Sequence, residues 1–395
     1  MFESRWLILA VLFIARFALG YQFQSAGSVA PFLIDRLQID YAQVGLLIGA
    51  FMLPGVAISL PSGFLARRFG DKNVVVAGMV LMIVGGVLTG VGPTYAVLLV
   101  GRLLSGAGGA VLVVVMLKMI IDWFAERELF FGMAVFIIGW PIGIAAGQAT
   151  QSRWADESHR WQDVCFAAAA LVGVALLLML LFYRLPPGAR PSSEAARRRL
   201  TRWEIAMACL TGAIWMFLNA AYLVVLSFGP SQLIERHPSF SGAHAGVSPK
   251  ADAVVSVTSW VFIVALPLGG YVANRLRAPT AVMVGGLVAS ILLGAYLPFS
   301  PMPLLSFALF GFALALAAPV VAALPARVLA PDVRGPGFGI YYLWYFGGMP
   351  VLIALAGQLS DSTGSATASL EFAVAMLVVC LPLLAIFRFV EARRR

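Results

Sequence analysis

The sequence predicts an all-α membrane protein with twelve transmembrane helices in two pseudo-symmetric six-helix bundles. Of its 395 residues, 61% are hydrophobic and only 11% are charged, whereas soluble domains are about a quarter charged. Apolar runs of about 18 to 25 residues, each long enough to cross a bilayer as a helix, recur along the chain. Local patterns of the first half also return in the second half at a constant spacing. Composition, run length and repetition therefore all indicate a duplicated polytopic membrane protein.

Twelve apolar runs define the expected spans. They cover residues 6–30, 42–63, 74–92, 96–120, 130–151, 163–184, 204–227, 251–272, 280–298, 303–325, 338–357 and 367–389. The longest polar stretch between spans falls after the sixth run. We therefore expect one bundle at residues 1–184, a cytoplasmic linker at 185–203, and a second bundle at 204–395.

The two halves share short patterns at one offset. Residues 63–68 (Gly-Phe-Leu-Ala-Arg-Arg) match residues 270–275 (Gly-Tyr-Val-Ala-Asn-Arg), and 270 − 63 = 207. Arg127 and Arg334 keep the same spacing of 207. Two repeats with a substrate site between them are the design of many secondary transporters.

Lysine and arginine set the expected orientation. With the N-terminus inside, the cytoplasmic segments hold 19 of the 27 Lys and Arg residues and the outer loops hold five. Positive residues concentrate on the cytoplasmic side of membrane proteins, so we expect both termini in the cytoplasm, in a bacterial inner membrane. The net charge of +9 then suits anionic lipids, and no nucleic-acid partner is expected.

Three motifs resemble the major facilitator superfamily. Residues 63–72, Gly-Phe-Leu-Ala-Arg-Arg-Phe-Gly-Asp-Lys, resemble its loop signature Gly-x-Leu-Ala-Asp-Arg-x-Gly-Arg-Lys. Residues 139–143, Gly-Trp-Pro-Ile-Gly, resemble its fifth-helix Gly-Pro motif with one residue inserted, and Arg102 resembles a fourth-helix motif residue. The resemblance implies transport by alternating access. It also implies gating or conformational roles for Gly63, Arg67, Arg68, Gly70, Asp71, Arg102, Gly139, Pro141, Gly143, Gly270, Asn274 and Arg275.

The chain departs from the family at the charged position 67. Arg67 stands where the signature has Asp, and Asn274 occupies the matching place in the second half. The charge contact of that Asp cannot form here in the same way. Within the family, residues 22–24 (Gln-Phe-Gln) and 228–230 (Phe-Gly-Pro) are similar to the branch that includes cyanate and nitroimidazole transporters.

Arg16 is the strongest candidate for a substrate anchor. It lies about ten residues into the first apolar run, hence about 15 Å deep at 1.5 Å per residue. A charge at that depth costs about 2.5 to 3.5 kcal/mol, so it marks a functional site by default. No Asp or Glu lies deep in any run, which leaves a bound anion as the simplest partner. The alternative is that Arg16 only locks the bundle by bonding to helix carbonyls.

Other polar and aromatic residues can complete a substrate site. Gln24 lies about 80° round the helix from Arg16, and Asn219 and Tyr222 occupy mid-depth in the seventh run. Tyr341 and Tyr345 begin the eleventh run, where an aromatic belt is the ordinary alternative. Helix packing is the alternative for Gln24, Asn219 and Tyr222. For Arg102 the alternative to substrate contact is packing, and for Lys118 the alternative to a gate is an interfacial lysine.

The sequence favours a secondary or facilitative transporter of a small anion. Proton relays usually need buried Asp, Glu or His, and Glu204, Asp252 and Glu371 all fall near predicted span ends. Exchange, uniport or proton movement with the substrate is therefore expected, without a cofactor, a metal, catalytic residues or enzyme activity, and in a monomer. A cation or drug exporter and a non-transporting receptor remain alternatives, as does an intramembrane enzyme, which would need paired carboxylates or metal ligands in the spans. Substrate identity, direction and coupling ion stay open.

Overall fold

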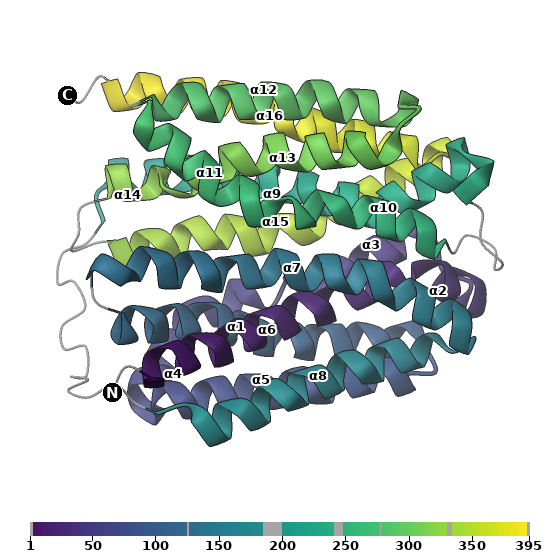
Figure 1. The fold of residues 1–395 in the computed structure, drawn as a ribbon, viewed down its shortest axis with the longest axis horizontal. Helices are drawn as coiled ribbons and strands as arrows, with labels where there is room; N and C mark the ends of the chain where they lie inside the picture. The colour runs from purple at the N-terminus through teal and green to yellow at the C-terminus, as the bar shows by residue number, and fades with distance from the viewer. Residues whose placement is uncertain are drawn as a thin grey trace. The chain divides into compact units, whose positions relative to one another are not determined.

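The protein is helical in all the residues that the structure describes. The computed structural model describes residues 3–124, 126–184, 200–240, 248–276, 278–329 and 334–392. Within these ranges its secondary structure is α-helical apart from two short 3-10 helices (Figure 1). Eleven helical segments there are long and apolar enough to cross a membrane. The remaining predicted span, 130–151, lies within the helix from Glu126 to Ser158, which confirms the all-α membrane fold.

The helices of the first half correspond to the first six apolar runs. They are α1 (Glu3–Ser28), α2 (Ala30–Leu37), α3 (Tyr41–Ala50), α4 (Gly55–Phe69), α5 (Asp71–Val91), α6 (Tyr95–Trp123), α7 (Glu126–Ser158) and α8 (Trp161–Phe182). The second half contains α9 (Arg202–Arg236), α10 (Pro249–Trp260), α11 (Phe262–Arg275), α12 (Pro279–Tyr296), α13 (Pro303–Ala322), α14 (Leu324–Val328), α15 (Arg334–Thr363) and α16 (Thr367–Ala392).

The sequence offset of 207 reappears in the helix boundaries. α4 begins at Gly55 and α11 at Phe262, and 55 + 207 = 262. α5 begins at Asp71 and α12 at Pro279, one residue beyond 71 + 207 = 278. The second span of each half is also broken at the equivalent place, since the turn before α4 ends at Pro54 and α10 and α11 are separated by Val261. The two halves therefore repeat the same order of helices, with equivalent helix boundaries and breaks.

The chain divides into two compact units. Unit 1 consists of residues 1–40, 46–193 and 243–249, and unit 2 of residues 41–45, 194–242 and 250–395. Most of the predicted linker, residues 185–199, lies outside the described residues. The limits of 1–184 and 204–395 for the bundles remain a prediction.

Each unit is organised around its first long helix. In unit 1, α1 packs against α7 and α8, and α5 packs against α6 and α8; Figure 1 shows α1 beside α7. In unit 2, α9 packs against α15 and α16, while α13 packs against α11 and α12. Because lipid is as apolar as the side chains, close van der Waals packing of such helices supplies much of their association energy.

Candidate substrate site

Arg16 lies at the middle of the first membrane-spanning segment. The segment extends from Arg5 to Ser28, so Arg16 is eleven residues from one end and twelve from the other. At 1.5 Å per residue either end is roughly 17 Å away. Its side chain is half-buried. By residue count, Arg16 therefore lies at the midpoint of this segment of α1.

Two aromatic rings of α7 accompany the Arg16 guanidinium. Its Cζ atom lies 5.3 Å from the ring centre of Phe136 and 5.5 Å from that of Trp140. The two rings are four residues apart and so share one face of α7. Cations within about 6 Å of an aromatic ring are attracted by its quadrupole. The rings orient Arg16 in a region where lipid cannot solvate it.

Trp140 is the residue inserted into the family's Gly-Pro pair. Besides its contact with Arg16, its ring lies 5.1 Å from that of Phe23 in α1. Sequence reasoning noted the insertion but did not assign it a role, and it missed Phe136 altogether. An aromatic residue inserted into a conformational motif opposite an intramembrane arginine was the signal that could have identified Trp140.

Glycines let α1 and α7 approach closely around this site. A Cβ atom on Gly139 would lie 3.1 Å from Cβ of Arg16. One on Gly143 would overlap the carbonyl oxygen of Phe17, and one on Gly20 would overlap that of Trp140. Small residues spaced four apart are a common helix-packing device in membranes. Gly139 and Gly143, with Pro141 between them in the helix, therefore position the backbone that carries Phe136 and Trp140.

Gln24 faces α7 as Arg16 does, but lies two turns further along α1. It is 3% exposed, and its Nε2 atom donates to Ser28 Oγ at 3.4 Å. A Cβ atom on Gly147 of α7 would lie 3.0 Å from Cβ of Gln24. Eight residues separate it from Arg16 by about 12 Å along the axis. The structure thus brings the two residues onto one side of α1, with Gln24 buried in the helix interface.

Arg102 of α6 is the second intramembrane arginine, and unlike Arg16 it is almost fully buried. It is 2% exposed. Its Nε donates to the Leu47 carbonyl at 3.1 Å, its Nη1 to that of Gln22 at 3.1 Å, and its Nη2 to that of Phe23 at 2.8 Å. The Phe51 ring lies 4.7 Å from its Cζ. Arg102 therefore links α6 to α1 and α3 by hydrogen bonds, which is the packing role expected as the alternative to substrate contact.

In unit 2, Asn219 and Tyr222 lie in the middle of α9. The Asn219 side chain is half-buried and its Nδ2 donates to the Trp215 carbonyl at 2.8 Å. Tyr222 is 5% exposed, its hydroxyl lies 2.6 Å from Ser259 Oγ, and its ring stacks on Phe262 at 4.9 Å. Tyr222 connects α9 to α10 and α11, whereas Asn219 keeps an exposed fraction.

Tyr341 and Tyr345 join an aromatic cluster in unit 2. Trp215 of α9 lies 6.2 Å from the Tyr341 ring and 6.5 Å from the Tyr345 ring. Tyr341 is 2% exposed, while Tyr345 is half-buried. Trp215 was missed from the sequence, although its place four residues before Asn219 puts both on one face of α9.

The turn between α4 and α5 carries the expected gating residues. Gly70 has φ of +84°, a region that side chains rarely adopt. Asp71 opens α5 with an 8% exposed side chain, and its Oδ2 lies 2.6 Å from Lys118 Nζ. Lys118 also lies 3.2 Å from Asp122, so it is an ion-paired residue of the α5 and α6 ends. Asp71 stands where the family signature has Arg, and Lys118 supplies the positive charge.

Neighbours of this turn extend the contacts. Lys72 Nζ donates to the carbonyls of Leu180 and Tyr183 at 2.9 and 3.0 Å, which places a cation at the C-terminal end of α8. Burial raises the pKa of Tyr183, so its hydroxyl stays neutral. Arg68 is exposed, with its Cζ 5.4 Å from the Phe69 ring. The surroundings of Gly63 and the side chain of Arg67 lie outside the described part.

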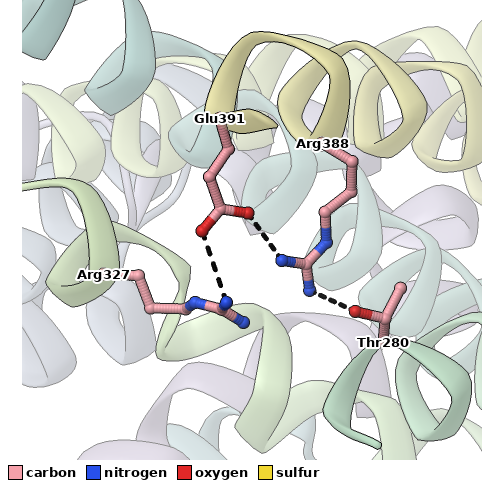
Figure 2. A network of polar contacts seen from close by, with 4 residues as sticks. All are labelled: Thr280, Arg327, Arg388 and Glu391. Atoms are coloured by element: carbon pink, nitrogen blue, oxygen red, sulfur yellow. Dashed lines mark hydrogen bonds and ion pairs between the residues drawn. The ribbon is translucent and has the colours of Figure 1, made fainter. Parts of the chain in front are cut away.

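The equivalent end of unit 2 is held by a different network. Figure 2 shows Glu391 of α16 between Arg388 at 2.7 Å and Arg327 of α14 at 3.3 Å. Arg388 also donates to Thr280 Oγ1 of α12, so one carboxylate and two guanidiniums join three helices.

The matched motif residues of the second half lie at the end of α11. A Cβ atom on Gly270 would meet nothing within 4 Å, so close packing does not require glycine there. Arg275 is exposed in the last turn of α11, and the side chain of Asn274 lies outside the described part.

The carboxylates considered for coupling lie near the N-terminal ends of helices. Glu204 forms a capping box with Thr201, whose Oγ1 accepts from Glu204 N at 3.2 Å and whose N donates to Glu204 Oε2 at 2.9 Å. Asp252 lies in the first turn of α10 and Glu371 is the fifth residue of α16. Across the described residues, no group of three or more His, Cys, Asp or Glu side chains is placed to hold a metal.

Helices of membrane length, packed closely through glycines, define a polytopic membrane protein. The profile of the Major Facilitator Superfamily matches residues 12–248, which is more than half of the chain. The chain belongs to this superfamily and is an integral, multi-pass membrane protein.

Relatives in the superfamily differ in what they carry. The hexuronate transporter of Bacillus subtilis (strain 168) is 25% identical over 285 residues, covering 69% of this chain and 65% of that protein. The quinolone resistance protein NorA of Staphylococcus aureus is 26% identical over 254 residues, 62% of each chain. An MFS-type transporter of B. subtilis, YhcA, is 27% identical over 153 residues, 38% of this chain and 28% of that protein. The chain thus spans less than two thirds of the length of these curated relatives.

Solved structures share the whole fold at low identity. The nucleoside transporter NupG superimposes with a TM-score of 0.77 at 16% identity, over 98% of this chain and all of that one. A bacterial homologue of the human lysosomal transporter Spinster gives 0.73 at 16% identity, over 99% of this chain and 97% of that one. These similarities establish the fold.

Proposed function

We propose that this transporter carries a small organic anion and that Arg16 is its anchor. The observation that carries the proposal is a half-buried guanidinium at the midpoint of α1, flanked by two rings of α7. Arg102, in contrast, is fully buried and serves helix packing. Of the two intramembrane arginines, Arg16 is the more exposed.

The charge distribution supports a negative substrate. Every Asp and Glu in the described residues lies in a connection or within five residues of a helix end. A cation at mid-depth would therefore meet guanidinium groups without a compensating carboxylate at the same level. A guanidinium donates two parallel hydrogen bonds to a carboxylate, and such charge-assisted pairs are about twice as strong as neutral hydrogen bonds.

One relative supports a carboxylate in particular. The B. subtilis protein is named for hexuronate, which is a sugar carboxylate. Within unit 2, taken by itself, Asn219, Tyr345 and Trp215 are half-buried and offer hydrogen-bonding and stacking groups. We infer a planar oxyanion group bound by Arg16 as the feature that selects substrates.

Orientation, membrane and oligomeric state complete the proposal. The excess of Lys and Arg in alternate connections, 19 against five, supports cytoplasmic termini in a bacterial inner membrane. The substrate-binding groups are proposed to belong to one chain, so a monomer is sufficient. The likeness of residues 22–24 and 228–230 to the cyanate and nitroimidazole branch gives small planar anions as the first solutes to screen.

The test is solute exchange in proteoliposomes made with Arg16 variants. Purified protein is screened by thermal shift against nitrate, cyanate, benzoate and glucuronate, since a ligand that binds the folded state raises its stability. We expect Arg16→Lys to lower exchange of the best solute severely and Arg16→Gln to abolish its binding. Arg153→Gln is the control, because Arg153 is exposed and paired with Glu157 in the same unit.

Folding must be checked beside exchange. We expect the Arg16 variants to purify as monodisperse protein with an unfolding midpoint near that of the wild type. Normal exchange by Arg16→Gln would refute the anchor and leave Arg16 with a packing role alone.

A cation or drug exporter is the second candidate. The similarity to NorA, a quinolone resistance protein, and the Gly139 to Gly143 motif favour it. Efflux of lipophilic cations by wild-type vesicles, unaffected by small anions, would support this function. Absence of flux for every solute that binds would instead support a receptor on the transporter fold.

A further inference from the structure

A pocket lies at the end of unit 1 opposite the Asp71 turn. It is formed where α2 ends, where α5 passes into the α6 connection, and where α7 turns into α8, at the end marked by α2 in Figure 1. Its volume is about 350 Å³, which is within the range of small-molecule sites. All of its lining residues belong to unit 1.

The pocket combines apolar and basic groups. Phe32 and Trp161 are 9% and 6% exposed and provide aromatic surface. Arg36, His159 and Arg160 are exposed beside them. The lining residues, all of them described, include no Asp or Glu. Asp163 is the acidic neighbour, 3.7 Å from Arg160 Nε, a separation at which the guanidinium keeps further donors for another group.

Two helices that border the pocket, α2 and α7, are each followed by a left-handed residue. His159 and Gln38, with φ of +55° and +52°, are the non-glycine residues of the described ranges in the left-handed region. His159 lines the pocket, and Gln38 directly follows Leu37, which also lines it. Ser158 Oγ bonds to the backbone of Arg160 at 3.3 Å, and Gln38 Nε2 bonds to the Asp35 carbonyl at 2.7 Å. Helices commonly end in a left-handed residue, and these bonds fix the segments that carry both arginines.

We propose that this pocket binds an organic anion consisting of a carboxylate or phosphate group attached to an apolar body. The two guanidiniums bind the oxyanion. Phe32 and Trp161 contact the apolar part. The site is separate from Arg16, and its ligand is either a free solute or the headgroup region of an anionic lipid, which share this chemistry.

The first experiment measures benzoate binding by calorimetry with the purified full-length protein in neutral detergent. It uses an Arg16→Gln background, so that a site at Arg16 cannot contribute to the signal. We expect one saturable site whose affinity falls at least about tenfold in Arg36→Gln/Arg160→Gln, the loss expected when charge-assisted hydrogen bonds are removed. Both arginines are exposed, so the fold should survive. Arg153→Gln, an exposed arginine of α7 outside the pocket, should bind as the background does.

The second experiment distinguishes the two ligand sources. Protein is reconstituted in nanodiscs of phosphatidylcholine with or without phosphatidylglycerol, and retained lipid is counted by native mass spectrometry. Benzoate binding that is equal in both discs identifies a solute site. Retention of phosphatidylglycerol that the double variant loses, with benzoate excluded by that lipid, identifies a lipid site. If neither benzoate affinity nor phosphatidylglycerol retention differs between background and double variant, the pocket is not an anion site.

Discussion

Arg16 and Arg102 show how one residue type takes two roles within the same unit. Both lie in membrane spans, and both have aromatic rings within 6 Å of the guanidinium carbon. Arg102 has three helix carbonyls as acceptors and almost no exposed surface, while Arg16 is half-buried. Burial, rather than charge, separates the packing residue from the proposed anchor.

We predict that Arg102 variants lose stability rather than substrate affinity. Arg102→Gln should lower the free energy of unfolding by at least one charge-assisted hydrogen bond, about 1.5 to 3 kcal/mol. Arg102→Lys should be intermediate, because one ammonium group cannot reach carbonyls on both α1 and α3. Unfolding midpoints and ligand dissociation constants of the purified variants test this. A higher dissociation constant for the ligand, with unchanged stability of the protein, would instead assign Arg102 to the substrate site.

Residue-scale sequence reasoning identified charged groups better than their partners. Arg16 stood out because an arginine in an apolar run is rare. Its partners Phe136 and Trp140 depend on which face α7 turns toward α1, and apolar sequences carry little information about that. The pairing of Lys118 with Asp71 joins residues 47 apart in sequence, whereas its contact with Asp122, four residues on, follows from helical spacing.

At the scale of elements, the α1 and α7 interface depends on glycine. Gly143→Ala should destabilise the protein by about 1 to 3 kcal/mol, the usual cost of an overpacked contact, because its Cβ would overlap the Phe17 carbonyl. Gly173→Ala in α8 is the matched control, since nothing lies within 4 Å of a Cβ there. Alanine should be neutral or stabilising by up to about 1 kcal/mol at Gly173. Equal unfolding midpoints for both variants would contradict the close approach of α1 and α7.

The helices themselves were largely predictable from apolar runs and the 207-residue offset. Departures occur where a span contains a break, as at Pro54 and Val261, because a continuous apolar run does not reveal a local turn. α7 and α9 also extend well beyond their predicted spans, to 33 and 35 residues. Their polar ends obey helix-capping and charge rules that hydropathy does not measure.

At the scale of the whole molecule, we predict that coupling does not depend on the carboxylates near the N-terminal ends of α9, α10 and α16. Glu204→Gln, Asp252→Asn and Glu371→Gln should each leave solute exchange nearly intact, and glutamine can still complete the capping box with Thr201. Uptake driven by a pH gradient, measured beside exchange, tests for a proton carrier. Loss of the pH-driven component in one variant alone would identify that residue as the carrier.

The predicted orientation can be tested with single cysteines in a background where Cys165, Cys209 and Cys380 are replaced. A membrane-impermeant maleimide added to intact cells should label Ser239→Cys, which is exposed before α10. Arg67→Cys and Ala195→Cys should react only after the cells are opened. External labelling at 67 or 195, but not at 239, would show that the topology is the reverse of the predicted one.

The Arg102 contacts also bear on how the chain is made. Synthesis proceeds from the N-terminus, so the acceptor carbonyls at Gln22, Phe23 and Leu47 are inserted before the arginine leaves the ribosome. Glu391 is likewise translated after Arg327, Arg388 and Thr280 (Figure 2). In both units the group that closes the network is translated after its partners. The order of residues along the chain thus spares the insertion machinery from holding Arg102 in lipid without acceptors.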